Sequence, residues 1–269
     1  MTQPGGHFFQ TIKKPVIATL HLKALPGSPS YRGEGLDRVI ENAVSDGAAL
    51  AAGGVDAICI QNNQDWPPAA ERAETIAYMT RIATEMRREF GPIPLGISIL
   101  PNGTDSALSV AHAVDAAFVR VKVYVGAVVA FGGIIEGTAY EAQSFRARTG
   151  AQDIQIAADV YDRSSSPLGS MPIEEAAVQA SRQGMADALV VTGTSVEESL
   201  ARVRLVKPRV GNTPVYVGGG TTHENVGRFL AEFDGVIVGH TFKRDKESGG
   251  GVDVARVRQY MEAVKRVRK

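Results

Sequence analysis

The stretch that most constrains this sequence is residues 118–125, Phe-Val-Arg-Val-Lys-Val-Tyr-Val, in which every second residue is valine. Strict alternation of β-branched residues predicts a strand with its valines on one face. Arg120 and Lys122 lie on the opposite face. At the edge of an open sheet these two side chains would face water, whereas in a closed parallel barrel they would point inward, because helices cover the outside. The choice between these structures decides where a functional site can lie.

Short apolar runs alternate with helical patterns along the whole chain. Strands are predicted at residues 16–22, 57–62, 94–100, 118–125, 154–161, 186–192, 214–220 and 235–243. Helices are predicted at residues 36–52, 73–90, 105–114, 140–149, 173–183, 196–206, 225–231 and 253–268. This pattern predicts an α/β fold, a single (β/α)8 TIM barrel with residues 1–269 as one domain. The alternative, a doubly wound open sheet, would require a dinucleotide-binding fingerprint after the first strand, and residues 22–27 do not contain one.

Charge and cysteine content narrow the class of protein. The 29 basic residues balance the 29 acidic ones, so bulk charge gives no reason to expect nucleic acid as a partner. The single cysteine, Cys59, lies in an apolar strand, which predicts a buried, inert thiol and suits a reducing compartment. Residues 1–10 lack the apolar core of a signal peptide, and the longest apolar run is shorter than the roughly 20 residues of a membrane span. We therefore expect a cytoplasmic protein without a transmembrane segment, while peripheral membrane contact stays open.

Polar residues gather at the predicted carboxyl ends of the strands, where barrel enzymes place their sites. The predicted ring comprises His21, Gln61, Asn62, Lys122, Asp159, Tyr161 and Thr192, with Arg120 one layer deeper. Lys122 and Asp159 fall on adjacent strands, so we expect a direct or one-water contact between them. Either Arg120, Lys122 and Asp159 only neutralise one another inside the barrel, or the ring is an active site, which convergence from five strands favours.

The active-site interpretation assigns a role to each group. Asp159 is the general acid or base, Lys122 stabilises negative charge or, less favourably, forms an imine, and His21 shuttles a proton. Gln61 completes the candidate catalytic set. The candidate substrate-binding residues are Arg120, Asn62, Asn102, Glu136, Tyr161 and Thr192. Scattered histidines argue against a transition-metal site, and Mg²⁺ carried in by a phosphorylated ligand stays open.

Glycines follow the seventh and eighth predicted strands. Gly218, Gly219 and Gly220 follow one strand, and Gly239 precedes His240 after the other. Barrels often bind phosphate here, because glycine lets the backbone approach a ligand and a helix N-terminus lies nearby. These five residues are therefore predicted to bind phosphate, and the alternative is that the glycines only form tight turns.

The segment after the fourth strand, residues 126–137, is apolar, glycine-rich and long for such a loop, and Glu136 is its only acid. It could close as a lid that excludes water from the site. It could equally form a contact surface for a partner or for a second subunit of the homo-oligomer that we expect.

Several phrases of the sequence resemble the BtpA family (BtpA/SgcQ). They lie at residues 16–31, 53–57, 134–137, 158–160, 167–168, 191–193, 218–225 and 235–239. The resemblance implies a ribulose-phosphate-binding type of barrel. It also implies relatives with different associations, since the founding member is tied to photosystem I accumulation at the thylakoid membrane and others look like partners of sugar-uptake operons.

This chain departs from the family pattern at positions in the predicted site. Family members usually carry an acid where Gln61 stands, asparagine at Lys122, and histidine and lysine at Tyr161 and Arg163, so we expect a different substrate or reaction. We predict an enzyme, whether isomerase, lyase or hydrolase, acting on a small phosphorylated or anionic metabolite of the sugar or nucleoside type. The alternative is a non-catalytic assembly or stability factor of the photosystem I type that uses residues 125–135 as its contact. A scaffold would not need interior charges from several strands.

Overall fold

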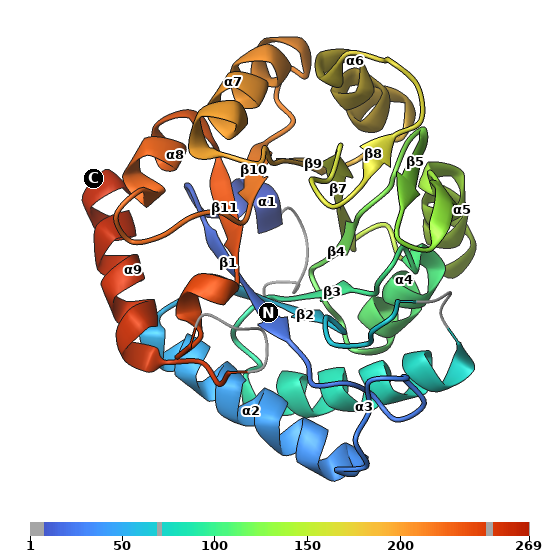
Figure 1. Cartoon of the computed structure of the whole chain (residues 1–269), viewed down its shortest axis with the longest axis vertical. Helices are drawn as coiled ribbons and strands as arrows, with labels where there is room; N and C mark the ends of the chain where they lie inside the picture. Colours follow the sequence, from blue (N-terminus) through green and yellow to red (C-terminus); the bar gives the residue numbers. More distant parts are fainter. Residues whose placement is uncertain (1–7, 69–71, 246–249, 269) are drawn as a thin grey trace.

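In the computed structural model, which describes residues 8–68, 72–245 and 250–268, eight parallel strands form a closed barrel (Figure 1). In order around the barrel the strands are β1 (Val16–His21), β11 (Gly235–Val238), β10 (Val215–Gly218), β9 (Ala188–Val191), β7 (Gln155–Val160), β4 (Phe118–Val121), β3 (Leu95–Ser98) and β2 (Ala57–Gln61). Both β2 and β11 pair with β1, which closes the sheet. The predicted barrel is confirmed, and the alternative of an open sheet is wrong.

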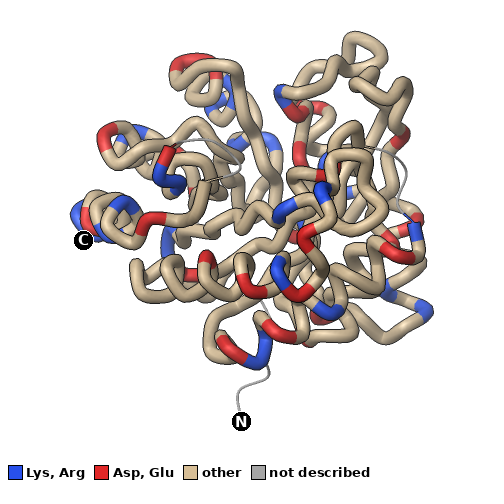
Figure 2. The backbone as a smooth tube through the Cα atoms, turned by 60° about the horizontal axis from the view of Figure 1, so that its bottom comes forward, with Lys and Arg blue, Asp and Glu red and all other residues tan. Residues whose placement is uncertain are grey.

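Helices surround the barrel and cover the outer faces of its strands (Figure 1). They are α2 (Leu36–Gly53), α3 (Ala73–Glu89), α4 (Thr104–Ala113), α5 (Ala139–Thr149), α6 (Ile173–Val178), α7 (Val196–Val206), α8 (Val226–Glu232) and α9 (Val254–Arg268). The predicted start of α7 is confirmed, because the Ser195 hydroxyl accepts a hydrogen bond from the Glu198 amide at 3.1 Å. Short helical turns also occur at η1 (Gln179–Gln183), η2 (Lys207–Arg209) and η3 (His240–Phe242). Acidic and basic positions are interspersed along the backbone in Figure 2.

The amino end of the barrel is filled with apolar side chains. The short helix α1 (Phe8–Thr11), which the sequence did not predict, packs against this end, and Phe8 stacks on Phe118 with ring centroids 5.2 Å apart. Cys59 belongs to the same cluster, which confirms that the thiol is buried, and this burial raises its pKa to about 12. The charged interior side chains Arg120 and Asp159 lie beyond this cluster, toward the carboxyl ends of the strands.

Residues 126–137 fold into a hairpin outside the barrel. Strands β5 (Ala127–Ala130) and β6 (Gly133–Glu136) pair antiparallel, and the two-residue strand β8 (Ser166–Pro167) adds to the other edge of β5. The segment predicted as a loop thus forms two strands of a small three-stranded sheet. Because it follows β4 and borders the segment after β7, it stands beside the carboxyl end of the barrel (Figure 1).

Candidate functional site

Four charged side chains form one cluster at the carboxyl ends of β4 and β7. Arg120 donates two hydrogen bonds to Asp159, each 2.9 Å long. Lys122 Nζ lies 3.0 Å from Asp159 Oδ2 and 2.7 Å from Asp162 Oδ1. The inward direction of Arg120 and Lys122 and the contact between Lys122 and Asp159 are confirmed, and the sequence analysis missed Asp162.

The cluster is graded from buried to accessible. The side chains of Arg120 and Asp159 are 8% and 3% exposed, whereas that of Lys122 is 19% exposed. Burial opposes ionisation of Asp162, but its pKa is lowered, because the charge and hydrogen bond of Lys122 and a hydrogen bond from Ser164 outweigh the burial. Burial likewise disfavours charge on Arg120, and the Asp159 carboxylate reverses this and raises the arginine pKa. Arg120 and Asp159 thus form a buried ion pair, and Lys122 is the cation of this cluster that is more accessible to a ligand.

Two of the predicted phosphate-binding glycines make room for polar side chains of the barrel. A Cβ atom on Gly218 would lie 2.7 Å from Arg120 Nη2, and one on Gly239 would lie 2.8 Å from His21 Cε1. The amide of Gly218 donates to Thr192 Oγ1 at 2.9 Å, and that of Gly219 donates to the Ile237 carbonyl at 2.7 Å. The amides of Gly218 and Gly219 are therefore already engaged, which corrects the expectation that they would donate to a phosphate.

The turn at Gly219 and Gly220 has positive φ angles of 96° and 72°, a conformation that favours glycine. The Arg163 guanidinium lies over it, since a Cβ on Gly219 would be 3.3 Å from Arg163 Nη2. The pKa of His240 is lowered, first by burial and then by the charge of Arg163. Arg163 is thus the cation of a surface that the neutral His240 ring and the glycine turn border, and an anion is its natural ligand.

His21 is a neutral imidazole beneath this surface. Burial, followed by the charges of His240, Lys243 and Arg120, lowers its pKa to about 3. Its ring lies 4.7 Å from that of His240, and its buried Nδ1 atom has no hydrogen-bond partner in the part of the chain that the structure describes. A ring with so low a pKa is a weak base, so His21 is better suited to form a hydrogen bond than to shuttle a proton as the sequence predicts.

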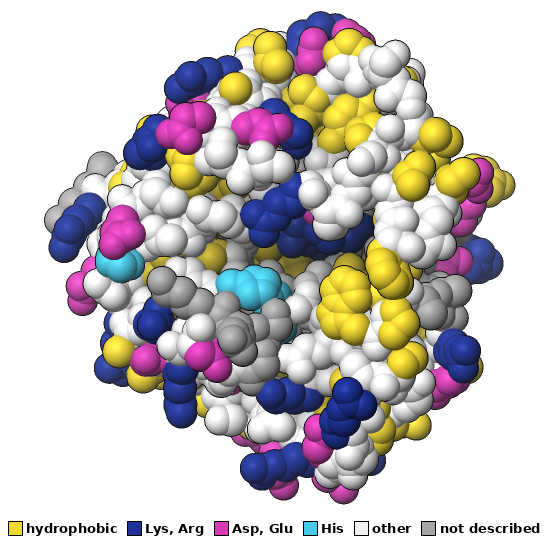
Figure 3. Space-filling view, in the orientation of Figure 1, with side chains coloured by type: hydrophobic (Ala, Val, Ile, Leu, Met, Phe, Trp, Pro, Cys, Tyr) yellow, Lys and Arg dark blue, Asp and Glu magenta, His cyan; other side chains and the backbone are white. Residues whose placement is uncertain are grey.

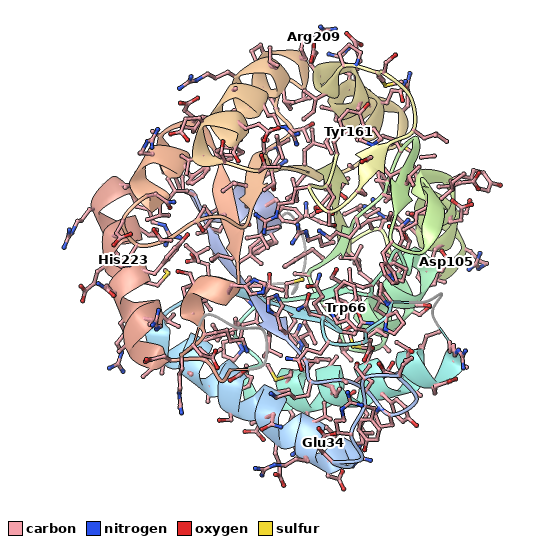
Figure 4. The ribbon with its side chains drawn as sticks, viewed as in Figure 1. Glu34, Trp66, Asp105, Tyr161, Arg209 and His223 are labelled. Atoms are coloured by element: carbon pink, nitrogen blue, oxygen red, sulfur yellow. The ribbon has the colours of Figure 1, made fainter. Side chains whose placement is uncertain are left out.

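A cavity of about 360 Å³ opens beside the charge cluster. Lys122 and Asp162 line it together with Trp66, which precedes α3, and Phe131, at the tip of the β5–β6 hairpin. Figure 3 shows basic side chains over the centre of the barrel with a hydrophobic group beside them and a histidine nearby. Figure 4 shows Trp66 well inside the ring of helices, while Arg209 and His223 lie toward its rim. The hairpin therefore forms a wall of the candidate site.

A model of the BtpA family matches residues 12–266. The chain belongs to the BtpA family. The photosystem I biogenesis protein BtpA of Synechocystis sp. is 35% identical over 262 residues, which cover 95% of this chain and 90% of the relative. The sgc region protein SgcQ of Escherichia coli is 33% identical over 261 residues, which cover 96% of both chains. The resemblance seen in the sequence is confirmed.

Solved barrels share the fold of this BtpA family member. The 3-keto-L-gulonate-6-phosphate decarboxylase of Vibrio cholerae superposes with a TM-score of 0.60 at 12% identity, covering 95% of this chain and 99% of that one. The N-(5'-phosphoribosyl)anthranilate isomerase of Pyrococcus furiosus gives 0.56 at 16% identity, covering 94% and 100%. At such identities the likeness concerns the fold alone.

Other predicted site residues hold the loops of this family member together. Asn62 accepts a hydrogen bond from the Leu100 amide at 2.8 Å and donates to Asp65 at 3.1 Å. The Asn102 side chain donates to the Val123 carbonyl and accepts from the Val123 amide, each at 2.9 Å. The backbone of Val123 is thus bonded to a side chain, and the strand predicted at residues 118–125 ends early, at Val121. Both asparagines thus fix loop geometry around the cavity.

Gln61, Tyr161 and Thr192 have hydrogen-bond partners within the protein. Gln61 Nε2 donates to Ser98 Oγ at 3.1 Å, and the Tyr161 hydroxyl donates to the Met171 carbonyl at 2.8 Å. The side chain of Thr192 accepts the Gly218 amide, and Glu136 is an exposed residue at the end of β6. These residues surround the charge cluster without forming a second one.

The described ranges contain neither a cluster of metal-ligating side chains nor a membrane-spanning helix. No group of three or more His, Cys, Asp or Glu side chains in these ranges is arranged to hold a metal ion. Among the same residues, no helix has both the length and the apolar character needed to cross a membrane.

Proposed function

We propose that this protein is an enzyme that acts on a small phosphorylated or otherwise anionic metabolite. The observation that carries the proposal is the position of Lys122, whose ammonium group is held between two carboxylates while it lines the cavity at the carboxyl ends of the strands. The anionic group of the metabolite would lie against Arg163, His240 and the turn at Gly219 and Gly220. The reacting part would then lie over Lys122.

The contacts refine the roles expected from the sequence. Asp159 already accepts three hydrogen bonds from two cations, so it is better suited to orient Lys122 than to abstract a proton. Lys122 would stabilise negative charge that develops on a substrate oxygen, because a fixed cation in a partly dry site is effective there. The neutral imidazole of His21, which its low pKa makes a weak base, would hydrogen-bond to the substrate without taking up a proton. Oxyanion stabilisation serves isomerases, lyases and hydrolases alike.

The fold supports a phosphorylated substrate at the level of architecture. Both solved barrels described above carry a phosphorylated compound in their names, and barrels commonly bind phosphate after the seventh and eighth strands. In this chain the basic residue beside that place is Arg163, which comes from the segment after β7. Its guanidinium suits a phosphate, since its planar fork can donate two parallel hydrogen bonds.

A non-catalytic role in assembly is the second candidate. The observation that favours it is the exposed apolar surface of the hairpin, where Val129, Phe131 and Ile134 are 46%, 76% and 64% exposed. The Synechocystis relative is named for photosystem I biogenesis. A pure assembly factor would bind its partner through the hairpin and would not need Lys122.

Two measurements test the enzyme. Calorimetric titration with ribose 5-phosphate should show binding that Arg163→Ala weakens about tenfold, because one charge-assisted contact is lost. The matched control is Arg209→Ala, which removes an arginine of η2 that pairs with Glu175 at 2.7 Å. Equal affinities for the parent and Arg163→Ala would contradict the anion assignment.

Turnover is tested with Lys122→Met, which keeps the stem and leaves the pair between Arg120 and Asp159 intact. Phosphorus NMR of a panel of sugar phosphates should show turnover by the parent and a loss of about 100-fold in the variant, with phosphate binding retained. Full activity in Lys122→Met, or no turnover of any compound by the parent, would favour the assembly role.

A further inference from the structure

Two exposed aromatic rings face the cavity from separate segments of the chain. Trp66 is 52% exposed and Phe131 is 76% exposed, and both line the cavity. Their ring centroids are 6.5 Å apart at an angle of 84°. Apolar rings left in water forgo the stabilisation that burial would give. Two such rings at one cavity therefore indicate a surface that an apolar group completes.

The cavity has a charged side and an apolar side. Lys122 and Asp162 provide the charge, whereas Leu100, Val128 and Ile134 belong to the apolar wall. A bare sugar phosphate would satisfy the charges and leave the aromatic wall in water. A wholly apolar molecule would instead cover the charged groups without pairing them, which is costly. The ligand that suits both sides carries an anionic end and an apolar end.

We infer that the substrate of this site is a phosphorylated or similarly anionic metabolite that also carries a planar aromatic or heteroaromatic ring. The ring lies against Trp66 and Phe131, and the anionic group lies toward Arg163. A flat ring suits this wall, because aromatic groups pack favourably face to edge or offset at centroid separations of about 4.5–7 Å. The inference rests on the proposed function, since it takes the anion surface and Lys122 as the rest of the same site.

A protein surface fits this place less well than a small molecule. The aromatic rings border a concave space of about 360 Å³ that continues to Lys122 and Asp162, and this volume falls within the range of small-molecule sites. A partner chain laid over the hairpin would cover these charges without filling the cavity. Contact with a second copy of this chain is therefore an outcome that the test must distinguish.

The test uses the full chain and its own fluorescence, because Trp66 is the single tryptophan of the sequence. Adenosine 5′-monophosphate and phenyl phosphate carry a phosphate and an aromatic ring, whereas ribose 5-phosphate carries a phosphate and no aromatic ring. We expect at least one ring-bearing compound to change the Trp66 emission and to bind at least tenfold more tightly than ribose 5-phosphate in calorimetry. If both bind no more tightly than ribose 5-phosphate, the ring inference is overturned and the anion site stands.

Substitutions locate the effect. Phe131→Ala should weaken binding of the ring-bearing compound about tenfold and leave that of ribose 5-phosphate unchanged. The matched control, Tyr140→Ala, removes an aromatic ring that is 82% exposed on α5 and does not line this cavity. An equal loss for both compounds, or a Phe131→Ala variant that dissociates an oligomer in ultracentrifugation without changing either affinity, would overturn the inference. If no phosphate compound binds, the proposed function fails with it.

Discussion

Removing the charge of Asp159 should destabilise the barrel strongly. Asp159→Asn keeps the shape of the side chain but leaves Arg120, whose side chain is 8% exposed, without the carboxylate that accepts both of its 2.9 Å hydrogen bonds. Breaking a buried pair from one side costs about 3–5 kcal/mol, because the remaining charge stays desolvated. We expect the free energy of unfolding to fall by that amount, independently of any catalytic role.

The double variant Arg120→Met/Asp159→Asn is the matched control. It removes both members of the buried pair and leaves Lys122 bonded to Asp162 at 2.7 Å. Replacing a buried ion pair by neutral groups of similar volume is often close to neutral, so most of the lost stability should return. The superficially similar Lys122→Met/Asp159→Asn variant should remain unstable, because Arg120 stays buried without its partner. The two hydrogen bonds from Arg120 to Asp159 therefore make Arg120, and not Lys122, the residue to replace together with Asp159.

Equilibrium unfolding in urea, followed by far-UV circular dichroism, measures the free energy of unfolding of the parent and of the three variants. The m-values should agree among the variants, so that differences in midpoint report stability. A cost below about 1 kcal/mol for Asp159→Asn, or a double variant Arg120→Met/Asp159→Asn no more stable than the single one, would refute the reasoning from a buried ion pair.

Two further predictions concern the neighbourhood of His21. Burial lowers its folded pKa to about 3, so the folded protein binds fewer protons than the unfolded chain below pH 6.5. The stability that depends on a neutral His21 is therefore complete above pH 6.5, and it is lost as the pH falls toward the folded pKa. Between pH 6.5 and pH 5 the parent should lose about 2 kcal/mol more stability than His21→Asn in urea titrations, and equal pH profiles would contradict the buried neutral imidazole. Gly239→Ala should lower the free energy of unfolding by about 1–3 kcal/mol, because the new methyl group would overpack against His21. The control Gly227→Ala should not lower it, because its Cβ would have its nearest neighbour at 3.6 Å. Similar melting temperatures for the two variants would show that the His21 ring moves aside freely.

Much of the fold could be predicted because it depends on local periodicity. The alternation in residues 118–125 placed Arg120 and Lys122 inside the barrel, and eight repeats of strand and helix then required closure. Adjacent strands also brought Lys122 within reach of Asp159. These steps needed only the order of the elements and the inward direction of every second residue.

What could not be predicted depends on contacts between loops that are far apart in the sequence. Nothing in the phrase around Trp66 shows that Phe131 faces it, since the two residues come from different connections. Arg163 was visible only as a departure from the family pattern, and its place over Gly219 follows from the path of the segment after β7. The packing of α1 against the amino end of the barrel likewise has no local signal in the sequence, because two adjacent phenylalanines can pack in many places.

The glycines at the carboxyl ends of β10 and β11 show that a sequence motif does not by itself reveal its role. In the sequence they predict a phosphate site, yet Gly218 admits the Arg120 guanidinium and Gly239 admits the His21 ring. Any barrel that directs large polar side chains toward its carboxyl end needs small residues on the facing strands, because interior volume is fixed by close packing. Substituting Gly218 or Gly239 by a larger residue would therefore disturb both the polar side chains inside the barrel and the anion surface. Loss of phosphate binding in a Gly218 or Gly239 variant would not identify a backbone contact, whereas Arg163→Ala changes the anion surface alone.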